Sequence, residues 1–482
     1  MMINKKKVIS DSIFISAGDL ILRLKSIIFI PIIISSVGIA KYGEFIQILI
    51  NISLIVPFCN LELGMGFYRY TSKYDESEVE KLSKDYWTIF ITVFLLSLFG
   101  GLVIYLVSPL ISKYILEGSS LKSLKLSSLL VINAGLKYVD IKYIQCRKKF
   151  KLFSVYNIFY ELMPYLGFIA GILIKLEIFF GLLLYLIIQS ILIIFLKVYV
   201  IRSLNFSIPS IRILKKFFIY SWPLIFSDFT GSLLSKVDRY FIGYFLGAAA
   251  IGVYNIVYSV CSLLFVFAVP FNKYFGIYLP QVWDEGKQDK VRVQLKEGIV
   301  YYLVISIGSL TGIVFLLKPG VNLILSNRIP TIANFEWLVL VTGLGILGWG
   351  IAAFFYHLIF YMEKNYLILI FQSIAVVLNM GLNYFLVKEY GIIGAGIATF
   401  ASYLTVLIMC NYYLRMNFDF NFIAKILKIV LAALIIGFWL YFYSVKNLID
   451  LGISITVGLA IYLFSIFMLR VIRFKGIKSI FA

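Results

Sequence analysis

The sequence has few charged residues for its length. Of its 482 residues only 14% are charged, whereas 61% are hydrophobic, and the mean hydropathy is +0.96. Soluble domains are typically about 25% charged and about 45–50% apolar. A water-soluble globular fold is therefore excluded, and we expect an all-α integral membrane protein, since helices satisfy their own backbone polar groups in lipid.

The chain also lacks the residue patterns of an enzyme, a metal protein or an ATP-driven pump. It has one histidine and four cysteines, with no CxxC pair, no metal-ligand spacing and no Ser-His-Asp or Cys-His arrangement. It has no GxxxxGK[ST] phosphate-binding motif. We therefore expect no catalytic residues, no metal and no cofactor. Any uphill transport must draw on an ion gradient, the membrane potential or the substrate's own gradient.

The apolar segments that are present are long enough to cross a membrane as helices. About 14 can be drawn, at residues 12–37, 43–67, 86–108, 124–144, 152–174, 178–200, 217–245, 251–279, 298–317, 335–361, 366–387, 391–414, 426–445 and 451–469. The first follows Lys5–Lys7 in the manner of a signal peptide. It contains Asp19 and Arg23, however, and shows no small-residue cleavage site, so we predict that it is retained as a helix.

Basic residues fall mainly on one side of the membrane when the chain is threaded through these spans. With the N-terminus in the cytoplasm, the inside segments collect about 30 Lys and Arg residues and the outside segments about 9. This bias predicts that both termini are cytoplasmic. It also accounts for most of the net charge of +20, so nucleic acid is not predicted as a partner.

Five residues in and just after the first span recur 209 positions later, in and just after the seventh span. Ser12, Asp19, Ser26, Gly38 and Gly43 correspond to Ser221, Asp228, Ser235, Gly247 and Gly252. Both spans start inside and end in a Gly-x4-Gly turn, which predicts two parallel, pseudo-symmetric six-helix bundles around a central cavity. The expected domains are residues 1–205 and 206–415, one bundle each, and residues 416–482, two further helices and a cytoplasmic tail.

Each of these two spans carries a polar stripe along one helical face. The first stripe holds Ser12, Ser16, Asp19, Arg23 and Ser26, with Lys25 in the same span, and the second holds Asp228, Ser232, Ser235 and Arg239, with Lys236 beside it. A charge at the bilayer centre costs at least about 2.5–3.5 kcal/mol, so the stripes should face protein or water rather than lipid. Two interpretations stay open: a cavity lining, which is favoured, and an Asp–Arg network that locks helices together.

The stripe acids Asp19 and Asp228, and other charged residues within the spans, are additional candidates for the cavity or for ion coupling. Glu161 lies in the middle of its span beside Pro164, which loosens the helix, and it is a candidate for protonation. Lys137 and Asp140 share a face with Asn133 near the cytoplasmic end of the fourth span. There they form either part of a site or an anchor that reaches the membrane surface.

Two polar features of the second half are expected to be structural. Gln372, Asn379 and Asn383 form a stripe that could bind sugar hydroxyls but is more typical of residues that join helices by hydrogen bonds. The only histidine, His357, lies near the inner end of its span and is expected to be a packing residue.

Four segments carry a resemblance to a known family. They are YGEF (42–45), LELGMGFYRYTS (61–72), DRYFIGYFLGAAAIGVYNIVYS (238–259) and NYFLVKEYGIIGAGIATFASY (383–403). In this order they resemble the polysaccharide-unit (O-antigen and capsule) flippases of the multidrug/oligosaccharidyl-lipid/polysaccharide exporter superfamily. The resemblance implies a V-shaped pair of six-helix bundles, as in multidrug exporters of that superfamily, with two added helices here.

The resemblance also implies a substrate and a site. The expected activity is alternating-access transfer of an undecaprenyl-pyrophosphate-linked oligosaccharide to the outer leaflet of the bacterial cytoplasmic membrane, coupled to an ion gradient. A cationic cavity would hold the headgroup, at positions that correspond here to Arg23, Lys25, Lys236 and Arg239. Membrane lipids, a polysaccharide polymerase and chain-length machinery are the implied partners.

Two other functions are weighed against this one. A multidrug cation antiporter of the same superfamily would gather acids and aromatic residues in its cavity rather than bases. A non-transporting assembly protein, such as a scaffold for a synthase, would tolerate substitutions in the stripes. The acids Asp19 and Asp228 dilute the cationic pattern, whereas the lysines and arginines favour the flippase.

Overall fold

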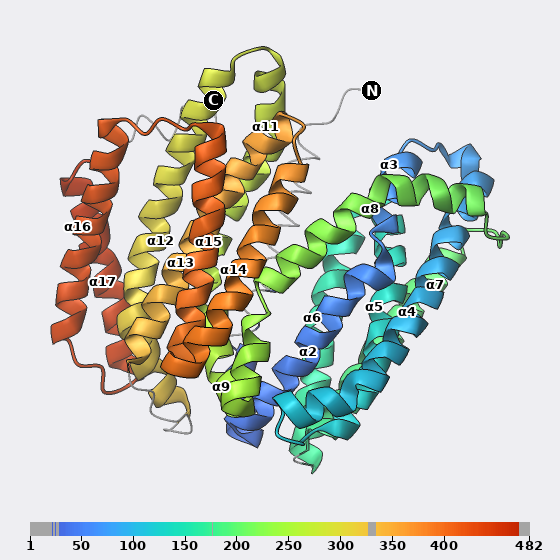
Figure 1. The fold of residues 1–482 in the computed structure, drawn as a ribbon, viewed down its shortest axis with the longest axis horizontal. Coiled ribbons are helices and arrows are strands. Elements are labelled where there is room, and N and C mark those ends of the chain that lie inside the picture. The colour runs from blue at the N-terminus through green and yellow to red at the C-terminus, as the bar shows by residue number, and fades with distance from the viewer. Residues whose placement is uncertain (1–21, 23–24, 26–27, 176, 326–333, 472–482) are drawn as a thin grey trace. The chain divides into compact units, whose positions relative to one another are not determined.

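The computed structural model describes residues 22, 25, 28–175, 177–325 and 334–471, and every regular element in these ranges is a helix (Figure 1). The chain divides into two compact units, Met1–Gly252 and Val253–Ala482. The division into domains at residues 205/206 and 415/416 stays a prediction. Asp19 and Arg23 lie outside the described residues.

The described part of unit 1 contains long helices and three short elements. They are a helix over 28–37, α2 (Ile39–Asn60), α3 (Leu63–Thr71), the 3₁₀ turn η1 (Glu76–Glu78), α4 (Val79–Ile115), α5 (Leu121–Cys146), α6 (Phe150–Lys175), α7 (Ile178–Ile201), α8 (Ile211–Leu234) and the first part of α9 (Asp238–Cys261). Helices α4 and α5 pack as one hairpin and α6 and α7 as another, while α8 crosses α2 and α3 (Figure 1). Phe67, Tyr86 and Val139 are almost completely buried in an apolar cluster that joins α3, α4 and α5 of this unit.

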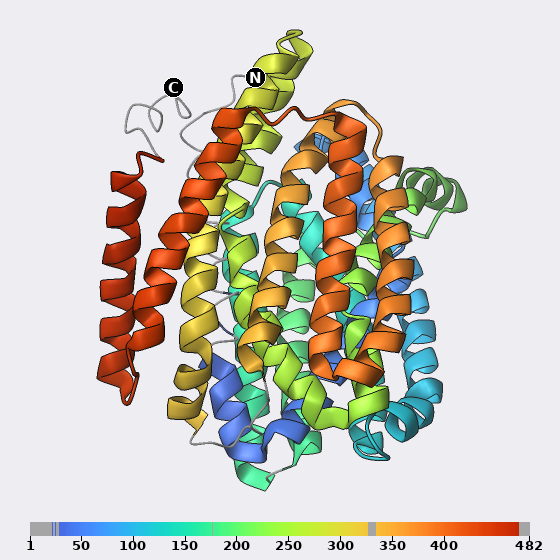
Figure 2. The same ribbon diagram turned by 60° about the vertical axis from the view of Figure 1, so that its left-hand side comes forward.

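Over residues 253–325 and 334–471, unit 2 contains the rest of α9 and eight further helices. These are α10 (Leu263–Val266), α11 (Val269–Asp284), α12 (Gln288–Leu325), α13 (Phe335–Tyr361), α14 (Tyr366–Tyr390), α15 (Ile392–Leu414), α16 (Phe420–Phe442) and α17 (Leu448–Met468). Helix α15 packs on both α13 and α14, and the hairpin of α16 and α17 packs on α12 (Figure 2). Phe438 and Phe442 of α16 are exposed, as expected where a helix faces lipid.

Eleven helices among the described residues are long and apolar enough to cross a membrane. One of them, Ile211–Val266, contains both α8 and α9, although the helix is interrupted at residues 235–237. Neither the charged helix α5 nor the short helix Ile28–Val37 is among the eleven. The all-helical membrane fold is therefore confirmed, and the count of 14 spans stays a prediction.

The 209-residue repeat has the same local backbone in both copies. Gly38 and Gly247 both adopt positive φ, at 85° and 80°, with ψ at 168° and −179°. This conformation is strained for a residue with a Cβ, so both turns need glycine. The predicted pair of equivalent Gly-x4-Gly turns is confirmed.

The second glycines of the two turns lie at one helix crossing within unit 1. A Cβ on Gly43 would lie 1.8 Å from the carbonyl oxygen of Ala248, and a Cβ on Gly252 would lie 2.6 Å from the carbonyl oxygen of Ile39. Ile39 and Ala248 are themselves related by the repeat, so α2 and α9 contact each other through equivalent positions. The close approach of the two backbones depends on the missing side chains.

We predict that Gly43→Ala lowers the free energy of unfolding by about 1–3 kcal/mol, because the added methyl group meets backbone atoms that cannot rotate away. The measurement is thermal unfolding of the purified protein in detergent. Gly381→Ala in α14 is the control, because a Cβ at Gly381 has no atom within 4 Å. Equal melting temperatures for the two variants would contradict the close crossing of α2 and α9.

Candidate functional site

Two membrane helices of unit 1 are interrupted, and each interruption carries an ionisable residue. Helix α8 ends at Leu234 and α9 starts at Asp238, so Lys236 lies in the break between them. Helices α2 and α3 are separated by Leu61 and Glu62, which both adopt left-handed φ values of 45° and 46°. Non-glycine residues rarely adopt this conformation, and such local strain gathers at functional sites. Broken membrane helices are also typical of transporter binding sites.

The break before α9 is held by a compact ion pair. Arg239 Nη1 contacts Asp238 Oδ1 at 2.7 Å and donates to the Ser235 carbonyl at 2.6 Å. Asp238 Oδ1 also accepts from the Arg239 backbone N–H at 2.9 Å, which caps the start of the helix. Both side chains are almost fully buried. The guanidinium of Arg239 therefore supports the break from within the protein.

Lys236 differs from Arg239 in its surroundings. It is half-buried, and within the described ranges its side chain forms no hydrogen bond or salt bridge. It interacts electrostatically with Arg239 and with the exposed carboxylate of Asp228. An ammonium group left at membrane depth without a direct partner is able to bind an anionic ligand.

Asp228 links the two interrupted helices by charge. It lies on α8 and interacts electrostatically with Lys236 on one side and with Glu62 and Lys142 on the other. Glu62 accepts a hydrogen bond of 3.0 Å from the Tyr138 hydroxyl on α5. These interactions join two acids, Asp228 and Glu62, to two bases, Lys236 and Lys142, so no single sign of charge dominates this part of unit 1.

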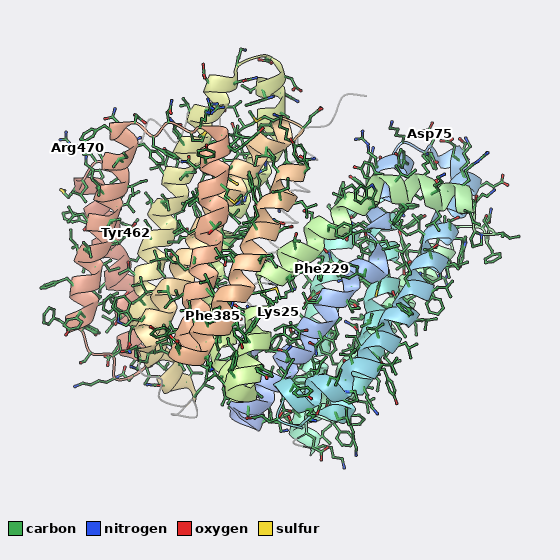
Figure 3. All side chains as sticks on the ribbon, viewed as in Figure 1. Lys25, Asp75, Phe229, Phe385, Tyr462 and Arg470 are labelled. Carbon is green, nitrogen blue, oxygen red and sulfur yellow. The ribbon has the colours of Figure 1, made fainter. Side chains whose placement is uncertain are left out.

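A second charged cluster lies at Glu161 of α6. Lys25 donates to Glu161 Oε2 at 2.7 Å, and Lys137 of α5 lies 3.4 Å from Glu161 Oε1. Lys25 lies beside α2 and α6 (Figure 3). The three side chains carry one net positive charge. The structure thus brings together Lys25, Lys137 and Glu161 from segments that are far apart in the sequence.

Asp140 takes part in a different cluster. Its side chain is 0% exposed and contacts Lys197 of α7 at 2.7 Å, and the Tyr86 hydroxyl of α4 donates to the same carboxylate oxygen. Lys197 also lies 3.6 Å from the centre of the Phe90 ring. Lys137 and Asp140 are three positions apart on α5, the spacing of residues on one helical face, but they contact different helices: Lys137 contacts Glu161 of α6, and Asp140 contacts Lys197 of α7. Whether they form part of a binding site stays a prediction. The Asp140 cluster joins α4, α5 and α7.

The predicted polar residues of unit 2 form contacts between and within its helices. Asn383 donates to the backbone carbonyl and side-chain oxygen of Asn379 one turn earlier, at 2.8 and 2.9 Å. Gln372 donates to the Tyr356 hydroxyl at 3.4 Å, and His357 Nε2 lies 3.2 Å from Asn272 Oδ1. Across 22, 25, 28–175, 177–325 and 334–471, no three His, Cys, Asp or Glu side chains gather into a candidate metal site.

Unit 2 also has an apolar groove of about 510 Å³. Helices α12, α16 and α17 form it, and glycines at 308, 312 and 458 leave room between their larger apolar neighbours. Ser309, Ser454 and the Tyr462 ring are among its few polar residues, and the Tyr462 hydroxyl donates to the Val304 carbonyl at 2.6 Å. The lining fits a hydrocarbon chain rather than a polar ligand.

Sequence reasoning did not single out four residues of the unit 1 clusters. They are Lys142 and Lys197, which lie near the predicted cytoplasmic ends of their spans, and Tyr160 and Tyr165, which lie beside Glu161. The signal for the tyrosines is their spacing at one position before and four positions after an intramembrane acid. With 34 tyrosines in the chain, that signal alone is weak.

Long apolar helices that are interrupted at charged positions define a multi-pass membrane protein of the transporter type. The chain belongs to the family of polysaccharide biosynthesis proteins, which matches residues 8–274, more than half of its length. The expectation raised by its sequence motifs is thereby confirmed.

Similar proteins agree with this class. One relative is a probable low-salt glycan biosynthesis flippase, Agl15, of Haloferax volcanii, 23% identical over 278 residues, which span 56% of this chain and 58% of the relative. The fold is similar to that of the lipid II flippase MurJ in an inward closed conformation, with a TM-score of 0.74 and 18% identity over 96% of this chain and 100% of that one. The fold is also similar to that of an inward-facing multidrug resistance MATE family transporter of the MOP superfamily. The TM-score is 0.62, and the identity is 14% over 82% of this chain and 94% of that one. These are transporters and not enzymes.

The buried Asp140–Lys197 pair leads to a prediction about stability. Lys197→Met should lower the free energy of unfolding by about 3–5 kcal/mol, because it leaves the Asp140 carboxylate buried without its cation. Adding Asp140→Leu to Lys197→Met should recover most of the loss. Thermal unfolding in detergent measures both effects.

The matched control for this prediction is the exposed ion pair of Lys318 and Glu336, whose charged atoms lie 3.0 Å apart. Lys318→Met should change stability by no more than about 1 kcal/mol, since exposed pairs contribute little. A double variant no more stable than Lys197→Met alone would show that the lost charge pairing is not the cause.

Proposed function

We propose that the protein moves a lipid-linked oligosaccharide, with an undecaprenyl-pyrophosphate anchor, from the cytoplasmic to the outer leaflet of the bacterial cytoplasmic membrane. The anionic headgroup binds the cations of unit 1, and the site opens in turn to the two membrane surfaces. A polysaccharide polymerase and chain-length machinery would use the product. Both termini would lie in the cytoplasm.

The observation that carries this proposal is the half-buried lysines of unit 1. Lys25, Lys137 and Lys236 each present an ammonium group at membrane depth while retaining some exposure. Ammonium groups bind phosphate oxygens by charge-assisted hydrogen bonds. Arg239 adds positive charge behind Lys236, and we expect Arg23 to do so beside Lys25.

The apolar groove of unit 2 supports the lipid part of the proposal. Its volume of about 510 Å³ and its almost wholly apolar lining fit part of a prenyl chain. The same chain would be excluded from the charged surface of unit 1 by the cost of removing water from charged groups. Taken by itself, the groove of unit 2 therefore suits a hydrocarbon chain, and the cations of unit 1 by themselves suit a charged headgroup.

Ion coupling is a further part of the proposal, with Asp228 as the favoured acid. Asp228 is exposed, and within the described part of the chain its carboxylate forms no hydrogen bond or salt bridge. Glu161, the other sequence candidate, has both oxygens occupied by lysines. A proton or sodium ion would reach Asp228 more readily, and its binding would alter the charge beside Lys236.

The multidrug cation antiporter is the second candidate. The acids Glu62, Asp228 and Glu161 favour it, because they could attract a cationic drug. Each of them has a lysine nearby, however: Lys142, Lys236 and Lys25 in the same order. A cation would have to compete with these ammonium groups, which makes the anionic headgroup the better fit.

We predict that Lys25→Ala and Lys236→Ala each reduce export of surface glycan by at least about tenfold, since one charge-assisted hydrogen bond contributes about 1.5–3 kcal/mol. The assay measures surface glycan in native cells in which the variant replaces the chromosomal copy. Lys388→Ala, at an exposed position near the end of α14, is the control and should export normally.

Protein amounts in the membrane are compared by immunoblot for every variant. Normal surface glycan in both Lys25→Ala and Lys236→Ala cells would refute the headgroup role. Loss of drug resistance with unchanged surface glycan would favour the antiporter instead.

A further inference from the structure

The Glu161 carboxylate lies between two lysines in a way that resembles a bound anion. One oxygen is 2.7 Å from Lys25 Nζ and the other is 3.4 Å from Lys137 Nζ. Glu161 is also the most exposed of the three, at 34% against 16% for Lys25 and 19% for Lys137. Two ammonium groups with one accessible carboxylate between them can exchange that carboxylate for another anion.

We propose that Glu161 is an internal competitor for the substrate headgroup. It neutralises Lys25 and Lys137 while the site is empty, and a phosphate group of the substrate displaces it when the site is loaded. When it returns to the lysines, it helps to release the product. This inference rests on the proposed function, and it assigns to Glu161 the regulation of substrate affinity rather than ion coupling.

A comparison with Asp140 separates this role from a structural ion pair. Asp140 is 0% exposed and its cation Lys197 is 16% exposed, so the acid lies deeper than the base. In the Glu161 cluster the order is reversed, and the acid is the more accessible partner. An incoming anion can therefore reach the place that Glu161 occupies, whereas the Asp140 carboxylate is closed off.

Aromatic rings hold the two lysines independently of Glu161. Lys137 Nζ lies 3.7 Å from the centre of the Tyr160 ring, and Lys25 Nζ lies 4.6 Å from that of Tyr165. Tyr165 in turn stacks on Phe29, with ring centres 5.5 Å apart. Such cation–π contacts persist when the carboxylate moves away, so the lysines keep their positions for a new anion.

The helix around Glu161 is loosened on one side. Pro164 has no backbone N–H, so the carbonyl of Tyr160, four residues earlier, lacks its usual helical donor. Glu161 follows Tyr160 directly and has a long side chain with several rotamers. The side chain can swing away from the lysines without breaking any further backbone hydrogen bond of α6.

Anion exchange also avoids an electrostatic cost. Without Glu161, the two ammonium groups would repel each other in a partly dehydrated place, which would oppose formation of the empty site. With Glu161 present, the lysines are paired before, during and after substrate binding. The same carboxylate must weaken binding, because the substrate has to replace two contacts before it forms its own.

The test uses the full-length protein in lipid nanodiscs, with farnesyl diphosphate as the probe and uncharged farnesol as the reference for tail binding. Glu161→Gln keeps the shape of the side chain and removes its charge. We expect it to bind farnesyl diphosphate at least about tenfold more tightly than the wild type, as the loss of a competing charge-assisted contact implies. Farnesol affinity should be unchanged.

Two further variants define the mechanism. Glu336→Gln removes the charge from an exposed ion pair with Lys318 in unit 2 and should leave diphosphate affinity unchanged. Combining Glu161→Gln with Lys137→Gln should return the affinity towards the wild-type value, because it removes one competing acid and one binding base. Size-exclusion chromatography reports folding, and Glu161→Asp, whose shorter acid withdraws from the lysines, replaces Glu161→Gln if the latter does not fold.

The outcomes distinguish this inference from the proposed function. If the wild type binds farnesyl diphosphate better than farnesol, but Glu161→Gln binds it no more tightly, the competitor role is overturned while the headgroup role stands. If neither protein prefers the diphosphate to farnesol, the headgroup role itself fails. Tighter binding by Glu161→Gln together with slower export of surface glycan supports displacement of Glu161 in each transport cycle.

Discussion

The need to keep every charge at membrane depth paired, or in contact with water, governs the interior of unit 1. A lone charge in hydrocarbon is costly, so each intramembrane ion must find a counter-ion, an aromatic face or an aqueous path. The chain uses all three. Asp140 and Lys197 form a buried ion pair. Lys25 and Lys137 both contact Glu161, and each also contacts a tyrosine ring. Lys236 is partly exposed.

These three solutions divide the charges into structural and functional groups. The buried pair of Asp140 and Lys197 joins α5 to α4 and α7, and its loss should lower the free energy of unfolding. The half-buried cluster at Glu161 is partly accessible and carries a net positive charge, which suits a reversible anion site. The helix breaks at Glu62 and Lys236 bring further charges to the same unit without closing them off. Support for the site and the site itself thus come from neighbouring faces of the same helices.

The duplicated glycine turns add a constraint of another kind. Gly43 and Gly252 allow α2 and α9 to meet backbone to backbone, which few other residues permit. The polar breaks in α2–α3 and α8–α9 lie on the helices that this crossing joins. Helix crossings that depend on small residues are typical of membrane proteins, in which close packing replaces the hydrophobic drive between helices.

Much of the fold could be predicted from the sequence. The high hydropathy indicates that the protein lies in lipid, the length of the apolar segments indicates membrane-spanning helices, and an offset of 209 residues reveals the duplicated turns. The identities of the intramembrane charges were equally visible. Their pairing was not. Lys25 and Glu161 are 136 positions apart, and helical periodicity assigns a residue to a face without saying which helix packs there. Lys137 and Asp140 show this directly, since three positions along α5 turn one towards α6 and the other towards α7. The sequence by itself determined a membrane transporter fold with charges at depth, and only the tertiary structure decided which charges are sealed and which are open to a ligand, because that depends on the packing of helices distant in the chain.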